Sequence, residues 1–209
     1  MSHLISSVVF IIMTVISSPV SAYIQIKGNN EFRQQVEAYL EQGMKISHHI
    51  RLLIEKVNDS PLKISIRPLT DNPETWHRGG DSSRSHTKAK KRKSAITGIR
   101  QISQAAIYIN PSRILRSDKT YSHGTLIHEF VHALDMVSNR YHENHVIREK
   151  RAVFFQNIWR EAHGRRLRKH YHKKFETLEY QQALERNQVS EFVDYMFNHD
   201  DLPSAGALL

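Results

Sequence analysis

A helical segment at residues 121–138 constrains the fold most, because its apolar residues cover most of the helix surface. Such a helix must be buried on several sides by other elements. It also carries polar residues on one strip, so that strip must face a cleft and not the core. The apolar positions recur at helical spacing: Leu126, Ile127, Phe130, Val131, Leu134 and Val137. The polar positions are His128, Glu129, His132 and Asp135.

The segments before this helix predict one long helix followed by strands. Residues 32–57 have the apolar spacing of an amphipathic helix, with a break near Gly43. Residues 62–67 alternate apolar and polar side chains, which is typical of a half-buried strand. Two further β-rich segments follow at residues 94–102 and 104–110.

The remaining residues, from Arg148 to about His199, are helical in composition, with breaks near Gly164 and near Asn187. The order of a helix, several strands and then helices predicts an α+β fold, in which a small sheet adjoins a helical C-terminal half. Residues 70–95 lack periodicity and predict a long exposed loop.

An apolar run at residues 4–16 has the length of a signal-peptide core and is short for a membrane span. Small residues before Tyr23 predict cleavage there, which leaves residues 23–209 as one catalytic domain. A membrane anchor or a buried strand is the alternative for this run. The chain has no cysteine, which excludes disulfides and a thiol nucleophile. We expect a secreted protein, extracellular or periplasmic, that is a monomer without a transmembrane anchor once the signal is removed.

His128 and His132 lie one helical turn apart, so both imidazoles can bind one metal ion. Glu129 is turned by about one hundred degrees from His128, which places it to activate a water molecule without binding the metal. Zinc (Zn²⁺) suits two imidazoles and a carboxylate. Asp135 shares the histidine face and could orient a ligand imidazole. With 14 histidines in the chain, solvated histidines on a surface helix are the alternative.

A third ligand must come from another part of the chain. Glu191, in a predicted helix with the sequence VSEFVDYMFNHDD, is the best candidate. Other candidates are Glu176, Glu179, Glu185, and the loop residues His142, Glu143 and His145.

The stretch HEFVHALD, followed at a distance by SEFVDYMFNHDD, resembles the zinc peptidases related to anthrax toxin lethal factor, which include the Pro-Pro endopeptidases and Mlc titration factor A. The resemblance implies a zincin fold, a gluzincin-like metalloendopeptidase activity and Glu191 as the third zinc ligand. It also implies a tyrosine that stabilises the oxyanion. Leu184 stands at the family position, and Tyr180, one helical turn further off, is the candidate for this role.

The mechanism expected from these residues is hydrolysis of a peptide bond by a zinc-bound water, with Glu129 as the general base. The substrate would be a protein or peptide that binds in extended form along an edge strand. Residues 104–110 are the candidate for that strand, and a plain core strand is the alternative.

Two other functions remain open. The basic run Lys88–Lys93 in the predicted loop could bind nucleic acid or another anionic surface, although no aromatic residue interrupts it. Alternatively, a non-catalytic protein could bind several zinc ions through its many histidines, including His170 and His172.

Overall fold

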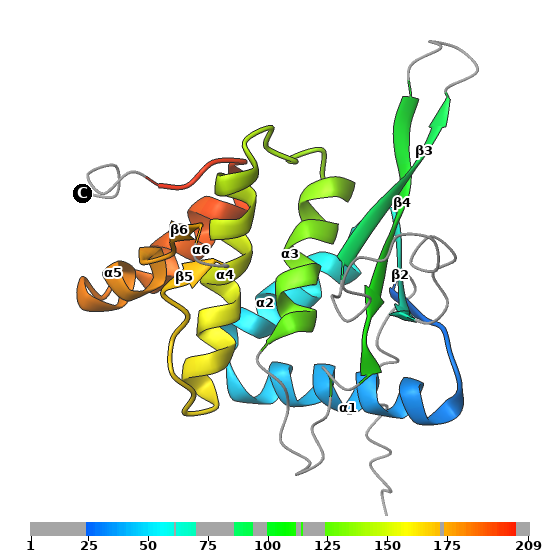
Figure 1. Cartoon of the computed structure of the whole chain (residues 1–209), viewed down its shortest axis with the longest axis horizontal. Coiled ribbons are helices and arrows are strands. Elements are labelled where there is room, and N and C mark those ends of the chain that lie inside the picture. The colour runs from blue at the N-terminus through cyan, green and yellow to red at the C-terminus, as the bar shows by residue number, and fades with distance from the viewer. Residues whose placement is uncertain are drawn as a thin grey trace, which may run out of the picture.

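A small mixed sheet and six helices make up the described part of the computed structural model, which covers residues 24–60, 62–69, 86–93, 100–111, 114, 124–171 and 174–203 (Figure 1). The strands pair in the order β1-β2-β4-β3, with β1, β2 and β4 parallel and β3 antiparallel to β4. The predicted α+β class is therefore confirmed. The helices are α1 (Asn30–Ile46), α2 (His48–Asn58), α3 (Thr125–Val137), α4 (His145–Ala162), α5 (Glu179–Glu185) and α6 (Val189–Asn198). The strands are β1 (Ile24–Ile26), β2 (Lys63–Pro68), β3 (His86–Lys93) and β4 (Arg100–Ile109), and a separate hairpin is formed by β5 (His170–Tyr171) and β6 (Phe175–Glu176).

The long helix predicted at residues 32–57 is present, but it is interrupted at Ser47 and not at Gly43. The Ser47 side chain accepts a hydrogen bond from the Ile50 amide and so begins α2. Gly43 lies inside α1, and a Cβ atom there would come within 2.8 Å of the Trp159 ring. The glycine therefore permits close packing and does not break the helix.

The sheet differs from the sequence prediction in two strands. The structure has one strand, β4, where two were predicted, although residues 94–99 lie outside the described part. The basic run Lys88–Lys93, predicted as loop, belongs to strand β3. The rest of the predicted loop, residues 70–85, also lies outside the described residues. β3 forms a strand because its backbone pairs with β4. Backbone hydrogen bonds do not require alternating apolar side chains, so the sequence of β3 shows no strand signal.

Helix α3 lies between the sheet and α4, as Figure 1 shows, and most of its residues are buried. Gly124 precedes it with a φ of 75°, and a Cβ atom there would lie 3.1 Å from the Trp159 ring. Trp159 in turn stacks on Tyr39 with ring centroids 4.1 Å apart.

The apolar residues of α3 are buried on several sides of the helix, which accounts for its central position and agrees with the sequence prediction.

The C-terminal half is largely helical, with breaks at the two predicted places. Gly164 and Asn187 both have positive φ values, 62° and 56°, which end α4 and α5. In the described part of the chain, no helix is long and apolar enough to cross a membrane. The predicted signal segment, residues 1–22, is outside the described residues.

Candidate metal centre

Two histidines on α3 lie side by side at the bottom of a pocket. The Nε2 atoms of His128 and His132 are 3.2 Å apart, and the two rings are nearly perpendicular. Both residues are buried, with 7% and 9% exposure. The i, i+4 spacing on a helix brings them together, as the sequence predicts.

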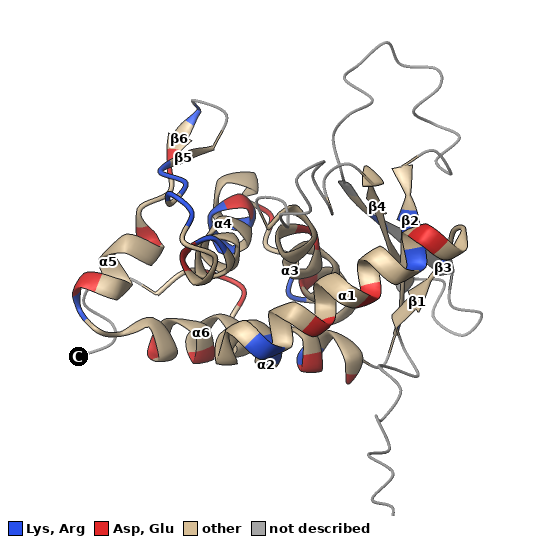
Figure 2. Cartoon of the chain, turned by 90° about the horizontal axis from the view of Figure 1, so that it is seen from below, with Lys and Arg blue, Asp and Glu red and all other residues tan. Residues whose placement is uncertain are grey.

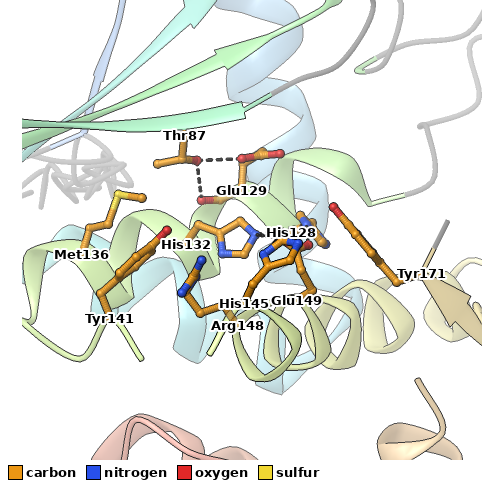
Figure 3. Close-up of a pocket in the computed structure, with 10 residues that line it drawn as sticks. All are labelled: Thr87, His128, Glu129, His132, Met136, Tyr141, His145, Arg148, Glu149 and Tyr171. Carbon is orange, nitrogen blue, oxygen red and sulfur yellow. Dashed lines mark hydrogen bonds and ion pairs between the residues drawn. The ribbon is translucent and has the colours of Figure 1, made fainter. Parts of the chain in front are cut away.

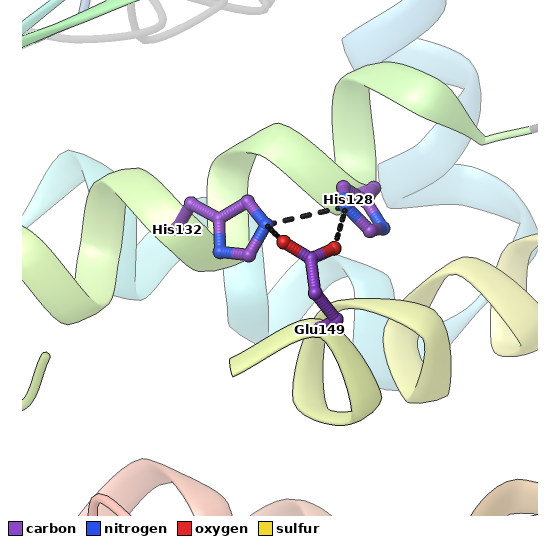
Figure 4. Close-up of side chains that lie close together, drawn as sticks. All are labelled: His128, His132 and Glu149. Carbon is purple, nitrogen blue, oxygen red and sulfur yellow. Dashed lines mark hydrogen bonds and ion pairs between the residues drawn. The ribbon is translucent and has the colours of Figure 1, made fainter. Parts of the chain in front are cut away.

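A carboxylate from α4 completes the cluster (Figure 4). The oxygens of Glu149 lie 3.1 Å from Nε2 of His128 and 3.5 Å from Nε2 of His132. One ligand atom from each of the three residues lies within 4.8 Å of the other two. Among the described residues, this is the group of three such side chains that could hold a metal ion.

Burial and mutual contact shift the pKa values of all three side chains. Burial alone would raise the pKa of Glu149, but hydrogen bonds from the two imidazoles and their charges outweigh it and hold the pKa far below its usual range. Burial lowers the pKa of His128. For His132, burial acts in the same direction, but contact with Glu149 and the nearby Glu129 raise its pKa above the usual value. The cluster therefore combines an ionised Glu149 carboxylate with two imidazoles that both contact it.

The donor set fits a divalent metal ion. Two imidazole nitrogens and a carboxylate converge from two helices, which is the combination that zinc uses in hydrolytic sites. A neutral imidazole has a lone pair at one ring nitrogen, so each histidine could offer Nε2 to a metal ion beside the carboxylate. All three donor side chains lie on helices, His128 and His132 on α3 and Glu149 on α4.

Glu129 belongs to the same pocket but is held away from the cluster by strand β3 (Figure 3). The Thr87 hydroxyl lies 2.7 Å from the Glu129 carboxylate and 3.1 Å from the Glu129 backbone carbonyl. The Glu129 side chain is buried, with 6% exposure for the residue. Glu129 therefore lies beside the cluster and in contact with Thr87 of the sheet.

The pocket has a volume of about 340 Å³ and contains all of these groups. Tyr171 of β5 forms one wall, with its ring parallel to that of His128 at 6.2 Å. Burial, together with the charge of Glu149, raises the pKa of the Tyr171 hydroxyl above its usual value. The lining residues are Thr87, His128, Glu129, His132, Met136, Tyr141, His145, Arg148, Glu149 and Tyr171.

The two sequence candidates from the C-terminal segment lie elsewhere. Glu191 is an exposed residue on the first turn of α6 and is not part of the cluster. Tyr180 is buried on α5, where its hydroxyl donates to Glu161 and its ring packs on Phe154. In the structure Glu149, and not Glu191, lies in the cluster with the two histidines, and Tyr180 packs against the core.

The other candidates for the third ligand have separate partners or surroundings. Glu179 forms an ion pair with Lys150, and Glu185 accepts a hydrogen bond from Gln181. Of the loop histidines, only His145 lines the pocket, with Nδ1 3.5 Å from Glu149. Glu176 is exposed on β6, and His142 and Glu143 lie in the turn before α4. Of the two histidines of the zinc-sequestering alternative, His170 is exposed and His172 is outside the described residues.

Sequence reasoning missed Glu149 and Thr87. Glu149 lies in the second turn of the helix that directly follows α3, across a connection of seven residues from Ser138 to Asn144. Helices joined by a short connection are usually neighbours in space, so an acid near the start of α4 is a better candidate for the third ligand than an acid far along the chain.

Asp135 was predicted to orient a ligand imidazole. In the structure its carboxylate accepts hydrogen bonds from Arg151 at 2.9 and 3.2 Å.

Comparison with known proteins gives one family. The model of the peptidase M91 family, described as effector proteins, matches residues 21–153. The matched segment contains α3 and Glu149 but ends before Tyr171, Tyr180 and Glu191. No curated protein and no solved structure matches the chain significantly. The match supports a metallopeptidase, and it does not extend to the lethal-factor group that the two short motifs resemble.

Proposed function

Because the chain belongs to the peptidase M91 family of effector proteins, we propose that it is a zinc-dependent metalloendopeptidase with a metal ion held by His128, His132 and Glu149. The convergence of these three donors beside Glu129, in a pocket open to a substrate, is the observation that carries the proposal. The nucleic-acid and zinc-sequestering alternatives have no comparable support.

Zinc in this position would polarise the scissile carbonyl and make a water molecule a good nucleophile near neutral pH. His128, His132 and Glu149 would occupy three coordination positions and leave a fourth one open, as in catalytic zinc sites. All three come from helices and line the pocket.

Glu129 would serve as the general base. It would accept a proton from the attacking water and donate it to the leaving amine. Thr87 holds one carboxylate oxygen at 2.7 Å, so the carboxylate is oriented before substrate arrives. A base that is already oriented loses less entropy in the reaction.

We propose Tyr171 for the role for which the sequence suggested Tyr180. It lines the pocket with its ring parallel to that of His128, and its hydroxyl, protonated near neutral pH, can donate a hydrogen bond. We assign its hydroxyl the role of stabilising the negatively charged oxygen that develops on the scissile carbonyl.

Export, with cleavage of the signal segment after residue 22, remains part of the proposal. The family's description as effector proteins implies that the substrates are proteins.

The proposal is tested with purified protein, residues 23–209, by metal analysis and a peptide library. We expect about one zinc per chain and cleavage that a chelator abolishes and added zinc restores. Glu129→Gln should retain zinc and the fold but lose cleavage. A folded protein that binds no zinc would contradict the proposal, and so would cleavage that survives in Glu129→Gln.

A further inference from the structure

Strand β3 lies at one margin of the described sheet and next to the metal pocket. β4 pairs with one edge of β3, and no other strand of the described residues pairs with its outer edge. Thr87 near the start of β3 contacts Glu129, so the strand begins at the proposed catalytic base. The sequence prediction of residues 104–110 as the edge strand is wrong, because β4 lies between β2 and β3.

β3 leads away from the pocket. Figure 1 shows that it starts beside α3 and continues outward with β4 as a long hairpin. At a rise of about 3.3 Å per residue, the seven residues from Thr87 to Lys93 are separated by six steps and span about 20 Å. An extended peptide that pairs with the outer edge would therefore reach from the catalytic base along the whole strand.

The net charge of the chain is concentrated in the segment that contains this hairpin. Five of the eight residues of β3 are Lys or Arg. Residues 82–117 contain 9 of the 30 Lys and Arg residues and no Asp or Glu, so the other 21 basic residues are balanced by all 21 acidic ones. The acidic residues are spread over other elements, for example along α1 and α6 in Figure 2. The whole formal charge of +9 thus belongs to the part of the chain that contains the sheet margin beside the pocket.

We propose, on the basis of the function above, that the substrate is an extended acidic segment that pairs with the outer edge of β3. Backbone hydrogen bonds would supply affinity of the kind seen in strand addition, and the basic strand would select for acidic side chains. Lysine residues on an edge strand also discourage pairing with a second copy of the same basic strand.

The direction of pairing determines where the acidic residues lie. Antiparallel pairing is the more stable arrangement, so the substrate runs from the Lys93 end toward Thr87. The bond to be cleaved lies at the Thr87 end, next to Glu129. The segment along Lys88–Lys93 is then the one on the N-terminal side of the scissile bond. The acidic preference should therefore be on that side and not on the C-terminal side.

Cleavage-site profiling tests this position dependence. Wild-type protein is incubated with a peptide library, and we expect Asp and Glu to be enriched over several positions N-terminal to the scissile bond. The double variant Lys91→Glu, Arg92→Glu should lose this enrichment. The matched control Arg33→Glu, Lys56→Glu makes the same change in net charge on exposed residues of α1 and α2 and should keep it. Cleavage without acidic enrichment, or enrichment that both variants retain, would overturn the inference but leave the peptidase proposal intact.

A binding measurement separates the inference from catalysis. The Glu129→Gln protein is titrated with an eight-residue alternating Glu-Thr peptide, the matching Lys-Thr peptide and a short single-stranded oligonucleotide. We expect the Glu-Thr peptide to bind best, with affinity falling as salt is raised, and about 10- to 100-fold more weakly when Lys91 and Arg92 are reversed. Equal binding of both peptides would overturn the inference, as would tighter binding of the oligonucleotide through the same two residues. Selective binding of Glu-Thr without cleavage of any library peptide would support the surface and refute the peptidase.

Discussion

Replacing Glu149 by glutamine separates the ligand that the structure places in the cluster from the one that the sequence suggested. Glutamine keeps the size and one oxygen acceptor but removes the negative charge that faces His128 and His132. The matched control is Glu191→Gln, the same change at an exposed position on α6. Only the first variant should affect the metal.

The size of the effect follows from the number of ligands. Zinc bound by protein ligands contributes about 10–16 kcal/mol, so one of three equal ligands is worth about 3–5 kcal/mol. Such a loss weakens the zinc Kd by a factor of roughly 10² to 10⁴. Without metal, the variant also loses contacts between a buried carboxylate, with 9% side-chain exposure, and two imidazoles. Contacts to a charged group are worth about 2 kcal/mol, which lowers Tm by about 4–8 °C for a chain of this size.

Zinc affinity is measured by competition with a chromophoric chelator, and Tm by circular dichroism in the presence of excess chelator. Wild type and Glu191→Gln should agree in both measurements, and Glu149→Gln should be lower in both. The assignment of Glu149 fails if Glu149→Gln binds zinc like the wild type. It fails equally if Glu191→Gln loses zinc while keeping the metal-free Tm.

Three further perturbations test the remaining groups of the pocket. Thr87→Val removes the hydroxyl that contacts Glu129 and should lower kcat about 10- to 100-fold with unchanged zinc content; an unchanged kcat would show that Glu129 needs no such support. Tyr171→Phe should lower kcat by about 10² to 10³ with little change in KM, and a rise in KM alone would indicate a role in substrate binding. The raised pKa of His132 means that this imidazole keeps a proton to higher pH in the metal-free protein. Zinc must displace that proton, so its affinity should fall about tenfold for each unit that pH drops below this pKa, and a flat profile between pH 6 and 8 would contradict the proposed role of His132.

The features that depend on local periodicity could be predicted from the sequence. The spacing of apolar residues predicted α3 and its central position, and the i, i+4 spacing predicted that His128 and His132 would meet. The helix ends at Gly164 and Asn187 were also predictable, because both residues accept positive φ.

What the sequence could not supply depends on partners that are distant along the chain. β3 has no apolar alternation, and it becomes a strand through backbone pairing with β4. Glu149 resembles any other acid on an amphipathic helix until α4 packs on α3. Thr87 is separated from Glu129 by 42 positions, and no local pattern links the two.

The buried Arg151 explains why the C-terminal helix matters to the site although its Glu191 lies outside the cluster. All five N–H donors of the guanidinium are used: two bind Asp135 on α3, and three bind the backbone carbonyls of Met196, His199 and Asp201. Asp135 is three residues after His132, and Arg151 is two residues after Glu149. A buried fork with five fixed bonds therefore sets the position of the two ligand helices relative to each other, and α6 supplies part of its support. The stretch SEFVDYMFNHDD, which the sequence suggested as a source of a ligand, thus contributes to the candidate metal centre through the Arg151 contacts that join α4 to α3.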